Sequence, residues 1–484
     1  MTSPKFSLRF LAVWAAVACA LLAGGNAHAD DLLVVGNYYY GSVWRFDATS
    51  GAASGGFGYD NEGFYSMSLA SGNEICVTSN ILGLYSAYRF NRAGQYLGSA
   101  ADLWGGGQTA LTRGPDGNLY GIIFENYGQN GRVVRFDGPT PTDFVPNGSG
   151  GMLKPVWMLF GPDGRLYVAD NAAGILRFDA TTGAFIDTLV PMGRGGLQDI
   201  ASFVFGPDGR LYVASGTANN VLRFNPVSGA AMGPFVESGS GGLSTPRGLA
   251  FGPEGDLFVS SRDTRQVLRY DGRNGKFLGV FATLSGQFPY QPGNLAVVGP
   301  AATDSVWFDD ELPPGAWTSS SWTWTTDSPA PHSGTRAHRA PGATGMQEHA
   351  FAFANDTMSV AAGDSLFVYV NVNYSSRGTS EIMLSWCDET GWEHRAWWGA
   401  DSIPYGVNGT ASRRYMGVLP RSGSWARLEV PAKILGLEGH TVSGMGFASY
   451  DADATFDDVG KSSLPASEDA SRRPDQNPAA ASRP

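Results

Sequence analysis

The stretch FGPDGRLYVAD, Phe160 to Asp170, recurs along this chain at a nearly constant distance. It returns as FGPDGRLYVAS from Phe205 and as FGPEGDLFVSS from Phe251, and a looser copy, RGPDGNLYGII, begins at Arg113. Successive copies are 45 to 47 residues apart, a period typical of repeat architectures. Pro-Asp-Gly favours a tight turn, and the Leu-Tyr-Val that follows it favours a β-strand. Each copy therefore predicts two strands joined by a tight turn.

A second motif, Arg followed by an aromatic residue and then Asp or Asn, counts the repeats. Its six copies begin at Arg45, Arg89, Arg135, Arg177, Arg223 and Arg269. Six units of about four short strands predict an all-β fold whose first part is a six-bladed β-propeller. Because the triplet occurs in every unit, we interpret it as structural, pairing locally and holding each blade to its neighbour.

The first unit is incomplete, and the missing strand appears at the other end of the repeat region. Residues 293–300 match the segment that precedes Pro-Asp-Gly in the other units, whereas the strand at Leu32–Val35 has no such segment before it. We expect 293–300 to complete the first blade, which would leave no open sheet edge. Over residues 30–300 the repeat resembles that of NHL-type six-bladed propellers, and the resemblance implies this ring fold.

Composition and the N-terminus indicate a secreted protein. Residues 1–29 combine a basic start, an apolar run from Phe10 to Leu22 and a small-residue cleavage site ending at Ala29, as in a signal peptide. Cleavage near Ala29 would place the protein in the periplasm or outside the cell, and no other apolar run is long enough to span a membrane. The net charge of −11 and the lack of a basic cluster argue against nucleic acid as a partner.

The period stops near Pro300, and a second region follows over residues 301–460. Nine of the 13 tryptophans lie there, and Leu366–Val372 alternates as a strand does. The motifs FDDE, WARLEV and ATFDDVG resemble those of jelly-roll modules in secreted bacterial proteins, many of which bind carbohydrate. The resemblance implies a jelly-roll β-sandwich. Residues 461–484 are rich in Ser, Pro and Ala, so we expect a disordered tail.

Candidate ligand-binding residues follow from the loops and the aromatic side chains. Loops that differ between units, such as Arg262-Asp263, belong to one face of the ring, where binding residues usually lie. The propeller candidates are Tyr38, Tyr39, Tyr40, Trp157, Asp199 and Arg247. In the second region the candidates Trp392, His394 and Trp398 would share one face of a strand. They would either stack on sugar rings or fill the sandwich core.

Four carboxylates form a candidate metal site. Asp309 and Asp310 open the second region, and Asp457 and Asp458 close it. The first and last strands of a jelly roll often lie side by side, so these carboxylates would converge and bind a structural Ca²⁺. The alternative is a pair of acidic turns that face water.

The residues present limit the chemistry of the propeller. After residue 29 its sequence contains no histidine, which excludes a Ser-His-Asp triad within it. Streptogramin lyases have similar repeats but use a histidine and a metal. The sequence therefore predicts a secreted, non-catalytic protein that binds a polysaccharide or a protein. The alternative is a metal-dependent lactonase or lyase of the gluconolactonase type, for which the available acids are Glu62, Glu125, Asp170, Asp199 and Asp263.

Overall fold

The computed structural model describes residues 31–463, except 38–42, 58–62, 70–73, 82–83, 92–93, 105–106, 127–128, 139, 253, 285–290, 299–301, 320–321, 341–343 and 375–379. The predicted signal peptide and residues 464–484 lie outside the described part. Within that part the elements are β-strands and short 3-10 turns. Among the described residues, no helix could span a membrane.

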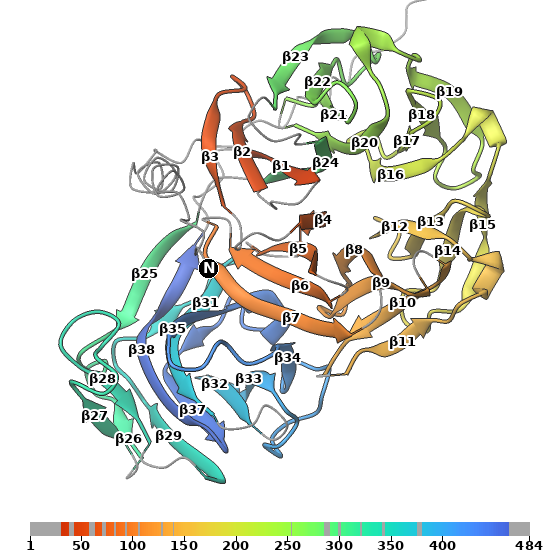
Figure 1. The fold of residues 1–484 in the computed structure, drawn as a ribbon. Coiled ribbons are helices and arrows are strands. Elements are labelled where there is room, and N and C mark those ends of the chain that lie inside the picture. Colours follow the sequence, from red (N-terminus) through yellow and green to blue (C-terminus); the bar gives the residue numbers. More distant parts are fainter. Residues whose placement is uncertain are drawn as a thin grey trace, which may run out of the picture.

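The first part of the described chain forms six four-stranded antiparallel sheets, which lie around a ring in Figure 1. The first two contain β24 (Gln291–Val298), β1 (Asp31–Asn37), β2 (Val43–Asp47) and β3 (Ala53–Phe57), then β4 (Gly63–Leu69), β5 (Glu74–Ile81), β6 (Leu84–Asn91) and β7 (Tyr96–Trp104). The third and fourth contain β8 (Gly107–Arg113), β9 (Leu119–Asn126), β10 (Gln129–Phe136) and β11 (Thr142–Val145), then β12 (Pro155–Phe160), β13 (Leu166–Asp170), β14 (Gly174–Phe178) and β15 (Phe185–Pro191). The fifth and sixth contain β16 (Ile200–Phe205), β17 (Leu211–Ser215), β18 (Asn220–Phe224) and β19 (Ala231–Val236), then β20 (Pro246–Phe251), β21 (Leu257–Ser261), β22 (Gln266–Tyr270) and β23 (Phe277–Thr283).

The ring closes through β24. This strand pairs antiparallel with β1, with Leu32 opposite Val297 and Val34 opposite Leu295, which confirms the predicted pairing of the two ends of the repeat region. Short 3-10 turns, η1 (Ser149–Gly151), η2 (Arg194–Gly196) and η3 (Ser240–Gly242), precede β12, β16 and β20. All five residues of β13, β17 and β21 are buried, because neighbouring sheets pack on both faces of each strand.

Two of the six repeated arginines, Arg177 and Arg269, link neighbouring sheets, as the sequence predicted for the triplet. Arg177 pairs with Asp187 of its own sheet and also donates from Nη1 to the carbonyl of Pro226 in the next sheet at 3.2 Å. Arg269 donates from Nη1 to the carbonyl of Thr49, which closes the ring from the sixth sheet to the first at 3.4 Å.

The second part is a sandwich of two six-stranded sheets. One contains β25 (Thr303–Phe308), β27 (Thr323–Thr325), β28 (Ala337–Arg339), β31 (Ser365–Asn373), β35 (Trp425–Pro431) and β38 (Asp453–Ser463). The other contains β26 (Trp317–Thr318), β29 (Met346–Ala352), β32 (Glu381–Asp388), β33 (Gly391–Gly399), β34 (Arg414–Gly417) and β37 (Gly444–Tyr450). A small sheet of β30 (Met358–Ser359) and β36 (Thr441–Val442), and the turn η4 (Ala432–Leu435), complete it.

The core of the sandwich lies between its two six-stranded sheets. Val368 and Val370 of β31 pack in one buried cluster with Leu384 and Trp386 of β32. The first and last strands are neighbours, with Phe308 opposite Val459. β38 runs to Ser463 and so includes the first three residues of the predicted tail, because this segment still pairs with β25.

A buried polar interface joins the sandwich to the second and third sheets of the propeller. In Figure 1 the sandwich lies beside β7. Arg89, only 2% exposed, donates to the carbonyl of Met416 at 2.5 Å. Arg414 donates to Asn118 Oδ1 at 3.1 Å. The two parts are therefore tied together through buried hydrogen bonds.

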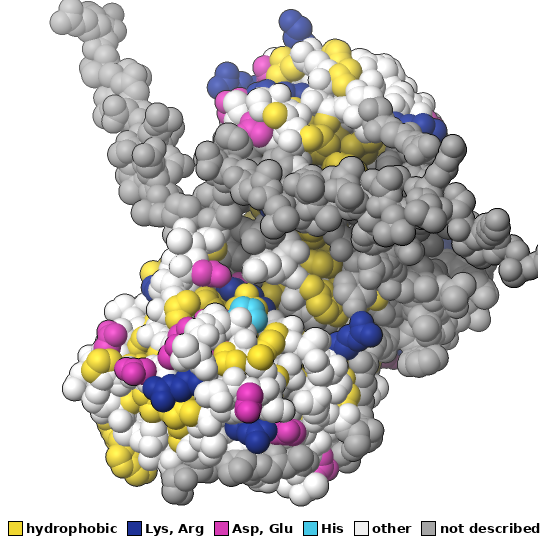
Figure 2. Space-filling model, turned by 60° about the vertical axis from the view of Figure 1, so that its left-hand side comes forward, with side chains coloured by type: hydrophobic (Ala, Val, Ile, Leu, Met, Phe, Trp, Pro, Cys, Tyr) yellow, Lys and Arg dark blue, Asp and Glu magenta, His cyan; other side chains and the backbone are white. Residues whose placement is uncertain are grey.

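The surface in Figure 2 carries acidic, basic and hydrophobic side chains interspersed over the described residues of that face. A broad field of one charge is not visible there. Recognition on this face would therefore depend on a local arrangement of groups rather than on a general charge.

Candidate functional site

A polar rim lies at one end of the propeller, where the chain enters the inner strands of the fifth, sixth and first sheets. Asp199 directly precedes β16, and Arg247 is the second residue of β20. Arg262 and Asp263 follow β21, and Gln291 begins β24. The start of β20 pairs with the end of β21, so these residues share one end of the ring.

The backbone of this polar rim is strained at two residues that are not glycine. Asp199 and Thr245 have φ values of 46° and 50°, in the left-handed region that β-branched residues rarely adopt. Asn219 Oδ1 accepts a hydrogen bond from the Thr245 backbone N–H at 2.7 Å, and Thr245 Oγ1 donates to Asp263 at 2.6 Å. Such strain persists only where surrounding contacts impose it, and it gathers at functional sites.

Gly216 makes room for Asp199. Its N–H donates to the Asp199 carbonyl at 2.8 Å, and a Cβ on this glycine would lie 2.4 Å from Asp199 Oδ2. Any larger residue at position 216 would therefore displace the Asp199 carboxylate.

Arg247 is the half-buried cation of the polar rim. Burial lowers the pKa of its guanidinium, while the charge of nearby Asp199 opposes this shift and that of Arg262 reinforces it. Arg262 is itself engaged, since its Nε donates to Gln291 Oε1 at 2.7 Å. Within the described part of the chain no group hydrogen-bonds the Arg247 guanidinium.

The structure brings together some of the predicted propeller residues and separates others. Asp199 and Arg247 lie close enough to interact electrostatically. Trp157 is only 6% exposed, and its Nε1 donates to the carbonyl of Phe203 at 3.0 Å, so it joins two sheets instead of lining the polar rim. Residues 38–40, which include the three predicted tyrosines, lie outside the described residues.

Sequence reasoning missed Thr245. A β-branched residue in the left-handed region has no local sequence signature. The available signal was positional, because Thr245 lies one repeat of 46 residues after Asp199.

Of the acids considered for a lactonase or lyase, Asp170 and Asp263 make other contacts, while Glu62 and the side chain of Glu125 lie outside the described part. Asp170 is fully buried and accepts four backbone N–H groups, from Leu153, Lys154, Ala172 and Ala173, at 2.6–2.8 Å. The described part of the propeller holds no group of three His, Cys, Asp or Glu side chains with mutually close ligand atoms. The enzyme alternative stays a prediction.

In the sandwich, β33 alternates between its two faces as predicted. Trp398 is 1% exposed and lies in the core, which leaves no ring face for a sugar. Trp397 is buried on the opposite face, where the Arg413 guanidinium lies 4.7 Å from its ring centre. Trp392 is half-buried.

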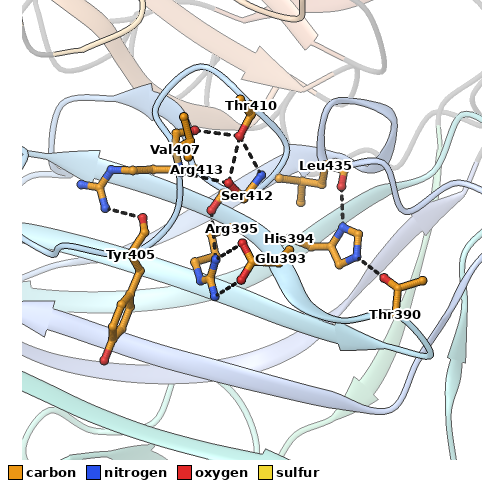
Figure 3. Close-up of polar contacts among 10 residues, drawn as sticks. All are labelled: Thr390, Glu393, His394, Arg395, Tyr405, Val407, Thr410, Ser412, Arg413 and Leu435. Atoms are coloured by element: carbon orange, nitrogen blue, oxygen red, sulfur yellow. Dashed lines mark hydrogen bonds and ion pairs between the residues drawn. The ribbon is translucent and has the colours of Figure 1, made fainter.

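His394 is 8% exposed and is held from both sides of its ring, as Figure 3 shows. Its Nδ1 lies 2.6 Å from the carbonyl of Leu435, and its Nε2 lies 3.3 Å from Thr390 Oγ1. On the neighbouring residues of the strand, Glu393 and Arg395 form an ion pair at 3.1 Å.

Three of the four carboxylates predicted to bind calcium converge. Ser333 Oγ lies 3.0 Å from Asp309 Oδ2 and 2.7 Å from Asp458 Oδ1, while Asp457 accepts the backbone N–H of His332 at 2.7 Å. Burial raises the pKa of Asp457 to about 7, and the adjacent Asp309 carboxyl adds to this shift.

The fourth, Asp310, points elsewhere. It accepts the backbone N–H groups of Thr335 and Arg336 at 2.7 and 2.8 Å. Calcium binding by the other three stays a prediction.

The ring of four-stranded sheets makes the first part a β-propeller. No family model matches the chain, and no curated protein matches it. Solved structures similar to it include a nidogen/laminin complex, with 14% identity and a TM-score of 0.43 over 55% of this chain and 98% of that one. A protein of unknown function from Bacteroides caccae has 15% identity and a TM-score of 0.42 over 56% and 99% of the two chains. TolB from Acinetobacter baumannii has 14% identity and a TM-score of 0.42 over 61% and 74%.

Proposed function

We propose that this protein is a secreted, non-catalytic binding protein whose polar rim binds an anionic group of a polysaccharide or protein ligand. The observation that carries the proposal is the half-buried guanidinium of Arg247, which has no hydrogen-bond partner among the described residues. Burial removes part of the hydration shell of this guanidinium, and no protein acceptor in the described part of the chain replaces the lost water molecules. A carboxylate that bonds in a bidentate manner would supply one.

The surroundings of Arg247 favour selective binding. Asp199 and Asp263 repel an anion that approaches from their side, while Arg262 adds a second positive charge nearby. The hydrogen bonds of Thr245 with Asn219 and Asp263 hold this entry loop in place, so less entropy is lost on binding.

The outer face of β33 supports a carbohydrate role for the sandwich. Glu393 and Arg395 present a polar pair there, and Arg395 lies 5.7 Å from the ring centre of Tyr405. Polar groups beside an aromatic ring suit a sugar, whose hydroxyls need partners and whose C–H face packs on rings.

Affinity electrophoresis of the full chain in gels containing polygalacturonate, polyglutamate or neutral dextran tests the rim. We expect retardation by an anionic polymer, and Arg247→Ala should weaken it about tenfold or more, as for a buried Arg anchor. The matched control is Arg210→Ala, in a Pro-Asp-Gly turn at the opposite end of the ring, where Arg210 pairs with Asp208 at 3.1 Å. Equal loss in both variants, or no retardation by any polymer, would contradict the proposal.

A further inference from the structure

A histidine and two carboxylates converge at one edge of the sandwich. Asp388 and Glu389 lie at the turn between β32 and β33, and His440 lies just before β36. His440 Nδ1 is 2.8 Å from Asp388 Oδ2 and 2.8 Å from Glu389 Oε1. In the part of the chain that the structure describes, these three residues are the one such group whose ligand atoms all lie within 4.8 Å of one another.

The Asp388 carboxylate is buried and only half satisfied. Its side chain has no exposed surface, and its Oδ1 accepts the Thr390 N–H and the Thr390 hydroxyl, both at 2.7 Å. Its Oδ2 makes no hydrogen bond, and neither does His440 Nδ1, so the 2.8 Å contact between them lacks hydrogen-bond geometry. A buried acceptor left without a donor is costly and calls for an explanation.

His394 makes no hydrogen bond to Asp388 Oδ2. Its Nδ1 donates to the Leu435 carbonyl, which can only accept, and its Nε2 lies on the side of Thr390 (Figure 3). That Nε2 lies 3.3 Å from Asp388 Oδ2. The Thr390 hydroxyl gives its proton to Asp388 Oδ1. Asp388 Oδ2 and His440 Nδ1 therefore lie 2.8 Å apart with neither atom satisfied by a hydrogen bond.

We propose that Asp388 Oδ2, Glu389 Oε1 and His440 Nδ1 bind a divalent transition-metal ion, for which Zn²⁺ is the best fit. Imidazole and carboxylate are its usual protein ligands. Bonds of about 2.0–2.1 Å in a tetrahedron place ligand atoms about 3.3 Å apart, so the present 2.8 Å contacts need to open only slightly. Calcium fits less well, because it prefers six to eight oxygen ligands.

The ion would have access from solvent. The Glu389 and His440 side chains are 60% and 32% exposed. Three protein ligands leave one tetrahedral position for water or for a donor group of a bound molecule. His394 acts as a positioning residue, since it packs against Asp388 Oδ2 without lying close to all three ligand atoms.

The test is Zn²⁺ titration calorimetry on the full chain after removal of metals with a chelator. Wild type should bind one ion at this site, and His440→Ala and Glu389→Gln should each weaken that binding at least tenfold. Both altered side chains are partly exposed, so we expect each variant to fold as wild type does. Thermal unfolding of each variant checks this. In wild type, Co²⁺ should show the visible absorption of a tetrahedral site, and His440→Ala should lose it.

The matched control is His332→Ala. His332 Nδ1 also contacts a carboxylate, Asp458, at 2.5 Å, but with the geometry of a hydrogen bond. We expect this variant to bind Zn²⁺ as wild type does. Absence of Zn²⁺ binding, undiminished binding by His440→Ala, or equal loss in His332→Ala would each overturn the proposal and leave an ordinary imidazolium–carboxylate ion pair.

Discussion

At the scale of single residues, surroundings decide what a given side chain does. Arg177 and Arg89 are both the arginine of the repeated triplet. Arg177 pairs with Asp187, whereas Arg89 donates to the carbonyl of Met416 in the sandwich. The two arginines occupy equivalent places in the repeat. Their partners differ because the sandwich lies beside the second sheet, which contains Arg89, and not beside the fourth sheet, which contains Arg177.

The histidine pair in the sandwich core shows the same dependence on surroundings. His338 and His349 are at most 1% exposed, and Nδ1 of the first lies 2.8 Å from Nε2 of the second. Burial lowers the pKa of both, that of His349 to about 3, and the charge of His349 adds to the shift of His338. Both rings are therefore neutral in the folded protein at neutral pH.

This pair should make the protein less stable in acid. An unfolded histidine titrates near pH 6.5, so below that pH the unfolded state binds more protons than the folded state. The free energy of unfolding should then fall as the pH drops from about 6.5 toward 3, by up to about 1.4 kcal/mol per pH unit for each ring. Urea unfolding of the full chain between about pH 7 and pH 4 measures the slope.

The variant His338→Phe, His349→Phe should show a shallower slope than wild type over that pH range. Equal slopes in wild type and the double variant would contradict the expectation. Asp457 acts in the opposite direction, because its raised pKa favours the folded state in acid, and the comparison between variants cancels its contribution.

At the scale of elements, strand pairing between distant segments gives the structure its closed sheets. β24 pairs with β1 across most of the propeller sequence. β38 pairs with β25 from the other end of the sandwich. Both pairings place side chains of different strands in shared clusters, so their effects on stability can be measured.

Truncation of a β24 side chain should destabilise the closure of the ring. Leu295 is 6% exposed and packs with Phe46 of the first sheet and Phe258 of the sixth. Leu295→Ala should lower the free energy of unfolding by about 2–5 kcal/mol. The matched control is Leu278→Ala on β23, where the leucine is 50% exposed and the change should stay within about 0.5 kcal/mol. Similar losses in both variants would contradict a closure role for β24.

The pairing of β25 with β38 brings the predicted calcium ligands together. Asp457 has a pKa of about 7 and shares this site with Asp309, so a proton occupies it at lower pH. Calcium should compete with that proton and raise the melting temperature of the full chain more at about pH 8 than at pH 6. At ten times its dissociation constant the ion should add about 1.4 kcal/mol.

Asparagine variants distinguish which of these carboxylates contribute to calcium binding. Asp309→Asn, Asp457→Asn should abolish the response to calcium. Asp310→Asn should retain it, because Asp310 is engaged with the backbone of residues 335–336. If calcium does not change the melting temperature of wild type, the predicted calcium site is wrong.

At the scale of the whole molecule, the buried interface couples the propeller to the sandwich. Arg89 donates to the carbonyls of Met416 and Glu429, at 2.5 and 3.4 Å. Arg89→Met should leave these buried carbonyls without that donor, at a cost of about 1–3 kcal/mol for a lost buried partner. Calorimetry of the full chain should then show the transitions of the two parts moving apart.

The control for this interface is Arg210→Met. Arg210 is about half-exposed and pairs with Asp208 across a surface turn, so its loss should change stability by less than about 0.5 kcal/mol. Unfolding of Arg89→Met that matches wild type would show that the two parts are not coupled through this arginine.

The sequence by itself determined the repeating sheets and the closure of the ring, because both follow from local patterns. Pro-Asp-Gly turns and short apolar strands recur with a period, and a strand missing at one end reappears at the other. Alternation along a strand likewise predicted that Trp397 and Trp398 lie on opposite faces of β33. It did not show that both would be buried.

Only the tertiary structure decided which polar groups meet, because such contacts join residues far apart in the chain. It buried Trp157 between two sheets, engaged Asp310 with the backbone of Thr335, and set His440 against Asp388. Neither residue of this last pair belongs to a sequence motif. Their distance depends on how the turn after β32 packs beside the segment that precedes β36, and on burial that removes water from a carboxylate.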